Sequence, residues 1–354
     1  MGENFGNPSS VHRWGREAKV KLEDARARIA ALIGCHPTEL FFTRGGTEAD
    51  NLAILGRARK TQHAPVVCSA IEHRAVLMAA RAAEAEGSTL HVLPVDRNGV
   101  VQEDALDDVL SPTPAVVSVM WANNEVGSVQ PVRRLAERCA EANVVFHSDA
   151  IQAFGKLDVR VDDMPIKLLS LSAHKIGGPK GVGALFIRKG TRVEPLIYGG
   201  GHERGMRAGT EDVAGAVGFA TAAELAIKER EHQAARLAAL RDRLQAALLE
   251  RVPGLVVNGA GAERLPNMLN VSVPGANTEV LLVMLDLEGI AVSSGSACSS
   301  GGVTPSHVLT AMGLDVETAG PSVRFSLGRE TTEKEIDFVI ERFPPLMERL
   351  RREF

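Results

Sequence analysis

The sequence has few cysteines, no long apolar run and no excess of positive charge. Its four cysteines include no C-x-x-C pair, which argues against a zinc site or a thioredoxin-type motif. No apolar run reaches the roughly 18 residues of a membrane-spanning helix, and the N-terminus does not follow the pattern of a secretory signal. A formal net charge of -4 suggests neither nucleic acid nor an acidic membrane as partner. We therefore expect a cytoplasmic protein that binds neither nucleic acid nor membranes.

The order of apolar and polar segments predicts an α/β protein. The chain has 354 residues, enough for a large domain and a smaller one. Short apolar runs alternate with helical periodicity through the first two thirds, which indicates a mostly parallel sheet covered by helices on both faces. A long helix is expected over residues 212–251, and strands and helices of a smaller α+β domain follow it. The expected domains are residues 1–230 and 231–354.

Lys175 lies in the most informative segment of the chain. It follows an apolar strand candidate, residues 168–171, and precedes a glycine-rich turn. If the strand buries this lysine, desolvation makes a neutral amine available for a Schiff base. Ser172 and His174 beside it can donate hydrogen bonds to a phosphate. The alternative is a solvated surface lysine, and for an isolated His-Lys pair that alternative would be favoured.

Two further segments suit the same cofactor. Asp149 ends an apolar strand candidate, where ligands bind in open α/β sheets. A carboxylate there can pair with a protonated pyridine nitrogen, although taken alone an aspartate that caps the following helix is the better explanation. Gly46 and Thr47 lie between a strand and a helix, where free N–H groups bind anions, but such a turn is weak support when taken alone.

Together these segments resemble the class V aminotransferases among the fold-type I pyridoxal phosphate enzymes, and more closely the cysteine desulfurases of the NifS/IscS type. The resemblance covers nearly the whole chain and implies a large domain with a seven-stranded, mostly parallel sheet. It rests on the motifs within residues 5–10, 47–52, 72–73, 123–127, 149–152, 172–175, 199–210, 293–298 and 324–329.

The resemblance implies a set of residues around the cofactor ring. Lys175 would carry the pyridoxal phosphate and later move the proton on the substrate Cα. Asp149 would face the pyridine nitrogen, and Gln152 the ring hydroxyl. His73 would stack on the ring and take part in proton transfer. Asn124 would contact both the cofactor and the substrate.

The resemblance also implies which residues bind the substrate carboxylate and the cofactor phosphate. Arg324 would grip the carboxylate of the substrate with a bidentate fork, together with Asn124. Thr210 would reach the phosphate from the neighbouring subunit, which implies a homodimer. His202, Glu203 and Arg204 would either support the cofactor site or lie in the dimer contact. The remaining phosphate-binding residues would be Gly46, Thr47, Ser172 and His174.

Cys298 differs from the other three cysteines. Small residues precede and follow it, so a flexible loop is expected. Its thiolate would attack the sulfur of L-cysteine, hold it as a persulfide and pass it to an acceptor such as an iron-sulfur scaffold. Apart from Cys298 as a transient ligand of a cluster shared with that scaffold, no metal site is expected. The others, Cys35, Cys68 and Cys139, are expected in the core.

The expected function is therefore desulfuration of L-cysteine to L-alanine for the synthesis of iron-sulfur clusters or other sulfur-containing molecules. One alternative is another class V aminotransferase or lyase, which would not need Cys298 on a loop. Members of the family begin with a further segment near the substrate, and this sequence opens after it. A truncated enzyme with impaired activity, or a non-enzymatic partner in sulfur transfer, is therefore a second alternative.

Overall fold

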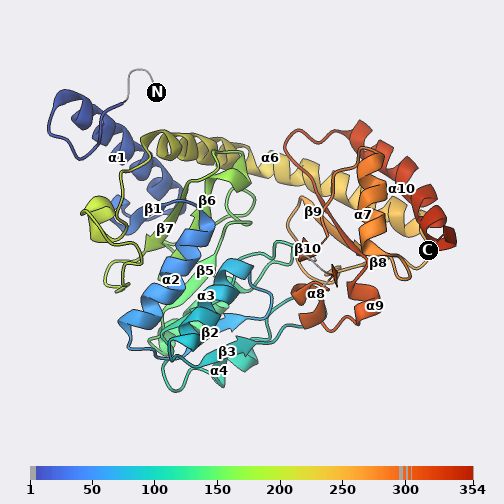
Figure 1. Ribbon diagram of the computed structural model, residues 1–354, viewed down its shortest axis with the longest axis horizontal. Coiled ribbons are helices and arrows are strands. Elements are labelled where there is room, and N and C mark those ends of the chain that lie inside the picture. Colours follow the sequence, from blue (N-terminus) through green and yellow to red (C-terminus); the bar gives the residue numbers. More distant parts are fainter. Residues whose placement is uncertain (1–4, 295–297, 300–301, 304, 354) are drawn as a thin grey trace. The chain divides into compact units, whose positions relative to one another are not determined.

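The computed structural model describes residues 5–294, 298–299, 302–303 and 305–353 (Figure 1). The chain divides into two compact units. Unit 1 contains residues 1–93, 102–121 and 130–230, and unit 2 contains residues 94–101, 122–129 and 231–354. Two short segments ahead of the expected boundary, 94–101 and 122–129, thus belong to the second unit.

Unit 1 is built on a seven-stranded sheet in the order β1-β7-β6-β5-β4-β2-β3. The five strands from β3 to β6 pair in parallel, whereas β7 runs antiparallel to both β6 and β1. The expected α/β fold with a mostly parallel sheet is confirmed. The strands are β1 (Leu40–Thr43), β2 (Val66–Ser69), β3 (Leu90–Leu93), β4 (Val116–Ser118), β5 (Phe146–Asp149), β6 (Leu168–Ser172) and β7 (Gly183–Ile187).

Helices cover this sheet because their apolar residues recur on one face. α2 and α3 pack together and share a core with β1, β2, β4, β6 and β7, formed largely by alanine, valine and leucine. α1 ends at Gly34, whose φ of 74° closes the helix with a left-handed residue. The helices are α1 (Arg13–Ile33), η1 (Pro37–Glu39), α2 (Gly46–Lys60), α3 (Arg74–Ala85), α4 (Asp104–Asp107), α5 (Val132–Glu141), η2 (Ala173–Ile176), η3 (His202–Gly205) and α6 (Val213–Arg251).

Unit 2 includes the C-terminal part of α6 and has its own hydrophobic core. Its three-stranded antiparallel sheet has the order β12-β9-β8, and apolar residues of α6, α7 and α10 pack with it. A separate hairpin pairs β10 with β11. The elements are β8 (Val256–Val257), β9 (Met268–Ser272), α7 (Thr278–Leu287), β10 (Cys298–Ser299), β11 (Gly302–Val303), α8 (His307–Ala311), α9 (Val316–Ala319), β12 (Ser322–Ser326) and α10 (Glu333–Glu353).

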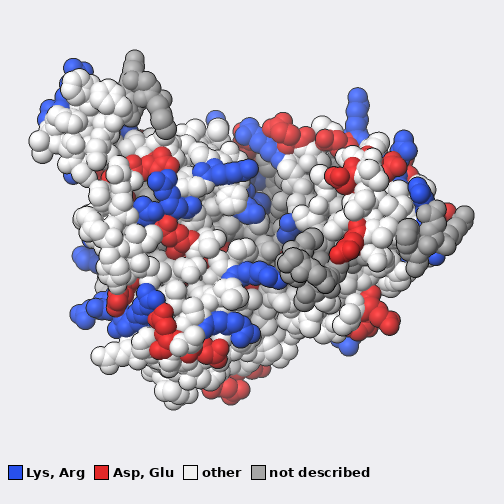
Figure 2. All heavy atoms as spheres, in the orientation of Figure 1, with Lys and Arg blue, Asp and Glu red and all other residues white. Residues whose placement is uncertain are grey.

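The surface has no dominant charge on the face that Figure 2 shows. Basic and acidic side chains are interspersed there, as the small formal net charge of -4 suggests. Within the described part of the chain, none of the helices combines the length and the apolar character needed to cross a membrane.

Candidate active site

Functional side chains of unit 1 gather where the parallel strands end. Asp149 is the last residue of β5, and β6 leads directly into the short helix η2, which carries Lys175. His73 lies just after β2 and caps α3 through its ring nitrogen. Because neighbouring parallel strands end at the same edge, the fold brings these residues together at the position where α/β sheets bind ligands.

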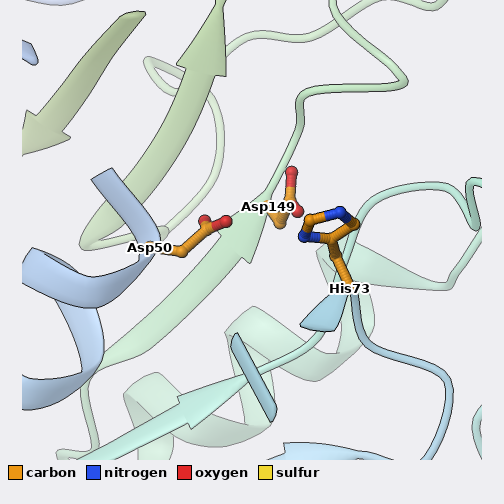
Figure 3. A group of neighbouring side chains, drawn as sticks. All are labelled: Asp50, His73 and Asp149. Carbon is orange, nitrogen blue, oxygen red and sulfur yellow. The ribbon is translucent and has the colours of Figure 1, made fainter. Parts of the chain in front are cut away.

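Asp149, His73 and Asp50 form the centre of this group (Figure 3). One side-chain nitrogen or oxygen from each lies within 4.8 Å of those of the other two. Asp149 is buried and accepts a hydrogen bond from the Ile151 N–H at 2.9 Å. Burial raises the pKa of Asp149 to about 6, while the Ile151 N–H and the charge of Lys175 act to lower it. Asp149 is thus mostly ionised at neutral pH.

The start of α2 forms an anion cradle beside this centre. No side chain caps the helix, and its N-cap Gly45 has a φ of 141° that favours glycine. A Cβ atom on Gly46 would lie 2.0 Å from Ile151 Cδ1, so a larger residue here would have to displace the end of the Ile151 side chain. Ser172 Oγ bonds His174 Nδ1 at 2.8 Å beside the same turn. These groups suit a phosphate at the helix N-terminus.

The described residues therefore fit pyridoxal phosphate. An uncapped helix start offers N–H groups to its phosphate, and a buried carboxylate is available for its ring nitrogen. A lysine whose charge acts on that carboxylate is available for its aldehyde. The three features match the three polar ends of the cofactor, and the fold assembles them at one edge of one sheet.

Lys175 itself is not buried, which corrects the sequence-based expectation. It is exposed, because η2 turns the chain out of the sheet directly after β6. The desolvated amine is instead Lys156, whose pKa burial lowers to about 8, with the charge of Lys175 contributing in the same direction. Lys156 Nζ donates to the backbone carbonyl of Gln152 at 2.8 Å. Gln152 is half-buried, and Thr47, His73, His174 and Thr210 are exposed.

A network of buried polar residues near Asp149 and Asp50 was not expected from the sequence. His147 in β5 bonds Ser118 Oγ at 2.8 Å and Ser170 Oγ at 3.0 Å. Burial lowers the pKa of His147 to about 3, so its ring is neutral. Glu72 accepts hydrogen bonds from Ser69 Oγ and the Met120 N–H, and burial raises its pKa to about 8. His147, a histidine inside an apolar strand, is the sequence feature from which this network could have been expected.

Asn124 and Arg324 belong to unit 2 and are in contact with each other. Arg324 Nη1 donates to the backbone carbonyl of Asn124 at 2.7 Å. Arg324 Nε is buried and has no hydrogen-bond partner among the described residues. Burial lowers the pKa of Arg324, and the charge of Glu125 opposes this effect. A guanidinium with one buried N–H unused suits the carboxylate of an amino acid.

Cys298 is described by its backbone alone. It opens β10 and pairs with Val303 in the two-stranded hairpin, so part of the expected loop is a short strand. The Cys298 side chain lies outside the described residues. The segment before it is tied to β12, because Ser293 and Arg324 exchange backbone hydrogen bonds of 3.2 and 2.7 Å.

The other cysteines have the chemistry of core residues. Cys68 and Cys139 are buried and Cys35 is half-buried. Burial raises the pKa of Cys35 and Cys139 to about 12, and that of Cys68 further still. Since the thiolate is the nucleophilic form, these three are poor candidates for catalysis.

A strained turn carries the segment that leads to Thr210. Glu203 and Arg204 have φ values of 46° and 55°, a region that such residues rarely adopt. Glu203 is held by the buried Arg26 at 2.7 and 2.8 Å and by the Phe42 N–H at 2.8 Å. Further along, Arg207 pairs with Glu48 at 2.9 Å. This segment is thus fastened to α1, β1 and the first turn of α2.

Replacing Glu203 with alanine should lower the free energy of unfolding by about 3 kcal/mol. The buried Arg26 would lose its buried partner and keep only the more exposed Glu23, whose Oε2 lies 3.1 Å from Arg26 Nε. The side chains of Arg26 and Glu203 are each 2% exposed. Urea unfolding followed by circular dichroism measures the change. Glu224→Ala, which breaks the more exposed pair with Arg28, is the control and should have a much smaller effect. Equal losses in the two variants would contradict the buried-pair explanation.

Comparison with known proteins identifies relatives along the whole chain. The family model described as aminotransferase class-V matches residues 2–339. The chain is 44% identical to the cysteine desulfurase IscS of Dictyoglomus turgidum, covering 99% of this chain and 90% of that protein. It is also 44% identical to the cysteine desulfurase NifS of Azotobacter vinelandii, covering 99% and 87%. A solved NifS-like protein matches with a TM-score of 0.91 at 36% identity, covering 98% of this chain and 93% of its own. The structure of SspA in complex with cysteine matches with a TM-score of 0.80 at 33% identity, covering 92% of both chains.

Proposed function

This chain belongs to the class-V aminotransferase family, and from that premise we propose that it is a pyridoxal phosphate-dependent cysteine desulfurase. It removes sulfur from L-cysteine, releases L-alanine and holds the sulfur as a persulfide on Cys298. The observation that carries this proposal is the convergence of Asp149, His73 and Lys175 at the carboxyl edge of the sheet, in a chain 44% identical to desulfurases over nearly its whole length.

Four residues act around the cofactor. Pyridoxal phosphate, when bound, supplies a ring that accepts electrons from the α-carbon of an amino acid. Asp149 pairs with the ring nitrogen and keeps it protonated, which its own ionisation at neutral pH permits. Lys175 holds the cofactor and moves the proton at the substrate Cα. His73 packs against the ring and assists proton transfer, and Gln152 binds the ring hydroxyl.

The phosphate is held by the cradle at the start of α2. Backbone N–H groups at Gly46 and Thr47 point to it, and the helix dipole favours its negative charge. Ser172 and His174 complete the cradle from the end of β6. Thr210 reaches the phosphate of the neighbouring subunit, on a segment that Glu203 and Arg207 fix in place.

Substrate binding and sulfur transfer use residues of unit 2. Arg324 and Asn124 bind the carboxylate of L-cysteine, and the unused Nε of Arg324 is the donor that the substrate satisfies. The Cys298 thiolate then attacks the substrate sulfur. A sulfur–sulfur bond forms while the carbon–sulfur bond of the substrate breaks, and the carbon skeleton leaves as L-alanine after protonation.

Mass spectrometry of Cys298 tests this proposal directly. The purified chain is incubated with pyridoxal phosphate and L-cysteine, alkylated without reducing agent and digested. The peptide that contains Cys298 should gain the mass of one sulfur atom, and L-alanine should appear in equal amount. L-Serine in place of L-cysteine is the control and should leave that peptide unchanged. Alanine formation without a change in this peptide would contradict the role of Cys298.

We further propose that the working enzyme is a homodimer that forms through the N-terminal region. Large apolar side chains gather there on the surface: Phe5 is 70% exposed, Val11 88%, Trp14 50% and Val20 68%. The rings of Phe5 and Trp14 lie 5.7 Å apart. Exposed apolar groups in such a cluster mark a protein–protein contact, and a second copy of the chain would also bring Thr210 to the neighbouring phosphate.

Replacing Trp14 with glutamate should convert the dimer to a monomer and weaken cofactor binding at least tenfold, because a charge enters the apolar contact and Thr210 no longer reaches its partner site. Sedimentation velocity and a pyridoxal phosphate titration measure the two effects. Val92→Glu introduces the same charge at an exposed apolar residue elsewhere, in β3, and should leave the dimer intact. A dimeric Trp14→Glu variant would place the contact elsewhere.

The persulfide needs an acceptor, for which we propose an iron-sulfur scaffold protein. Cys298 would then act as a transient ligand of a cluster that the two proteins share while it is assembled. Because the thiolate of Cys298 must remain reduced between cycles, we also propose that the enzyme works in the cytoplasm, where thiols are kept reduced.

A further inference from the structure

Asp50 is a buried carboxyl group with no assigned role. It lies in α2, is fully buried, and points toward Asp149 in Figure 3. Oxygen atoms of the two carboxyl groups lie within 4.8 Å of each other. Neither oxygen of Asp50 has a hydrogen-bond partner among the described residues. The ring nitrogen His147 Nε2 lies 3.8 Å from Asp50 Oδ1, which is beyond hydrogen-bond distance.

The groups that face Asp50 stabilise a charge on it less than burial opposes one. They include His73, which has a ring nitrogen within 4.8 Å of an Asp50 oxygen. On β5, His147 is neutral because burial lowers its pKa to about 3, and Asp149 is itself an acid. Glu72, after β2, adds a further carboxyl group whose pKa burial raises to about 8. The Ser170 hydroxyl on β6 favours the ionised form of Asp50, but its effect is smaller than that of burial.

Asp149 is better placed than Asp50 to carry a negative charge. It accepts the Ile151 N–H and lies in the field of Lys175, and both lower its pKa. For Asp50, burial raises the pKa well above its ordinary value, and the charge of Asp149 raises it further. Two buried carboxyl groups this close do not ionise together at neutral pH. The first to lose its proton is therefore Asp149.

We propose that Asp50 is a positioning residue that holds a proton beside Asp149, so that the pair carries a single negative charge and that charge lies on Asp149. Its part in the reaction rests on the proposed function, because it is through Asp149 that Asp50 acts on the cofactor ring. Because Asp50 is neutral, Asp149 is the one anion of this pair, and the ring nitrogen pairs with it.

Infrared difference spectroscopy tests the protonation state without cofactor or substrate. At pH 7, the spectrum of the wild-type chain minus that of Asp50→Asn should contain the carbonyl band of a protonated carboxylic acid. The wild-type spectrum minus that of Asp149→Asn should contain carboxylate bands instead. Carboxylate bands in the Asp50 difference would overturn the proposal. If Asp50→Asn does not fold, Asp50→Ser serves for the same subtraction.

The titration of Asp149 gives a second readout. Its carboxylate band is followed from pH 4 to pH 9 in the wild-type background and in the Asp50→Asn background. A neutral Asp50 predicts the same midpoint in both, because an amide replaces an uncharged acid. A midpoint in Asp50→Asn lower by about one pH unit or more would show that Asp50 carries a charge in the wild type, and would overturn the proposal.

The pH dependence of stability gives a third readout, and its sign is fixed. The pKa of Asp50 is higher in the folded chain than in the unfolded chain, where it is about 4. Asp50 therefore favours folding fully below about pH 4, and this contribution is lost as the pH rises toward the folded-state pKa. Between pH 5 and pH 7, the unfolding constant of the wild type should rise about tenfold more per pH unit than that of Asp50→Asn. Parallel curves would overturn the proposal. Since none of the three measurements requires desulfurase activity, failure of the proposed function would leave them unaffected.

Discussion

Replacing Cys298 with serine should lower sulfur release from L-cysteine by about 10³-fold or more, because a hydroxyl cannot take the place of a thiolate nucleophile. Cofactor binding should stay within about twofold of the wild type, since none of the groups that bind the ring or the phosphate is altered. Sulfide release in the presence of a thiol reductant measures the first quantity, and the visible absorption of the bound cofactor measures the second.

Cys35→Ser is the matched control for this variant. Cys35 is half-buried, and burial raises the pKa of its thiol to about 12, so its loss should leave sulfur release unchanged. Should Cys298→Ser instead retain sulfur release, the chain would carry out a different class V reaction, such as the elimination of sulfide from L-cysteine, that needs no cysteine on the hairpin.

Replacing Lys175 with alanine should abolish covalent attachment of the cofactor and lower the turnover of L-cysteine by about 10²–10⁴-fold or more. The variant loses both the amine that holds the cofactor and the group that moves the Cα proton. Borohydride reduction followed by peptide mapping should place the cofactor on Lys175 in the wild-type chain and on no peptide of Lys175→Ala.

Lys156 is the amine that could contradict this assignment. Burial lowers the pKa of Lys156 to about 8, so on chemical grounds alone it is the better source of a neutral amine. Lys156 is, however, bonded to the backbone carbonyl of Gln152, whereas Lys175 follows β6 at the edge where Asp149 lies. Cofactor found on the Lys156 peptide after reduction would show that Lys156, not Lys175, holds the cofactor.

The strand-and-helix alternation was readable from the sequence because each strand is a short apolar run between helical segments. The strand ends followed from it, and with them the positions of Asp149 and of the turn that carries Lys175. The prediction that Lys175 is buried was wrong, because an apolar strand does not reveal whether the turn that follows it enters or leaves the core. Here η2 leaves it.

Asp50 could not be recognised from local pattern. It lies on α2 between the buried Ala49 and the half-buried Asn51, and from the sequence an aspartate in a helix is typical of a solvated face. Its burial depends on the contact between α2 and the strands from β4 to β6, which come much later in the chain. The same limit applies to residues 94–101 and 122–129, whose membership of the second unit is a property of long-range packing.

Ser293 and Arg324 are joined by two main-chain hydrogen bonds, one in each direction. These bonds do not depend on the chemistry of either side chain, so altering the guanidinium leaves Ser293 anchored to β12. A proline at position 293 would do the reverse. It removes the N–H that donates to the Arg324 carbonyl and leaves the guanidinium unchanged. During divergence, position 324 can therefore change its side chain while the main-chain link to Ser293 is kept.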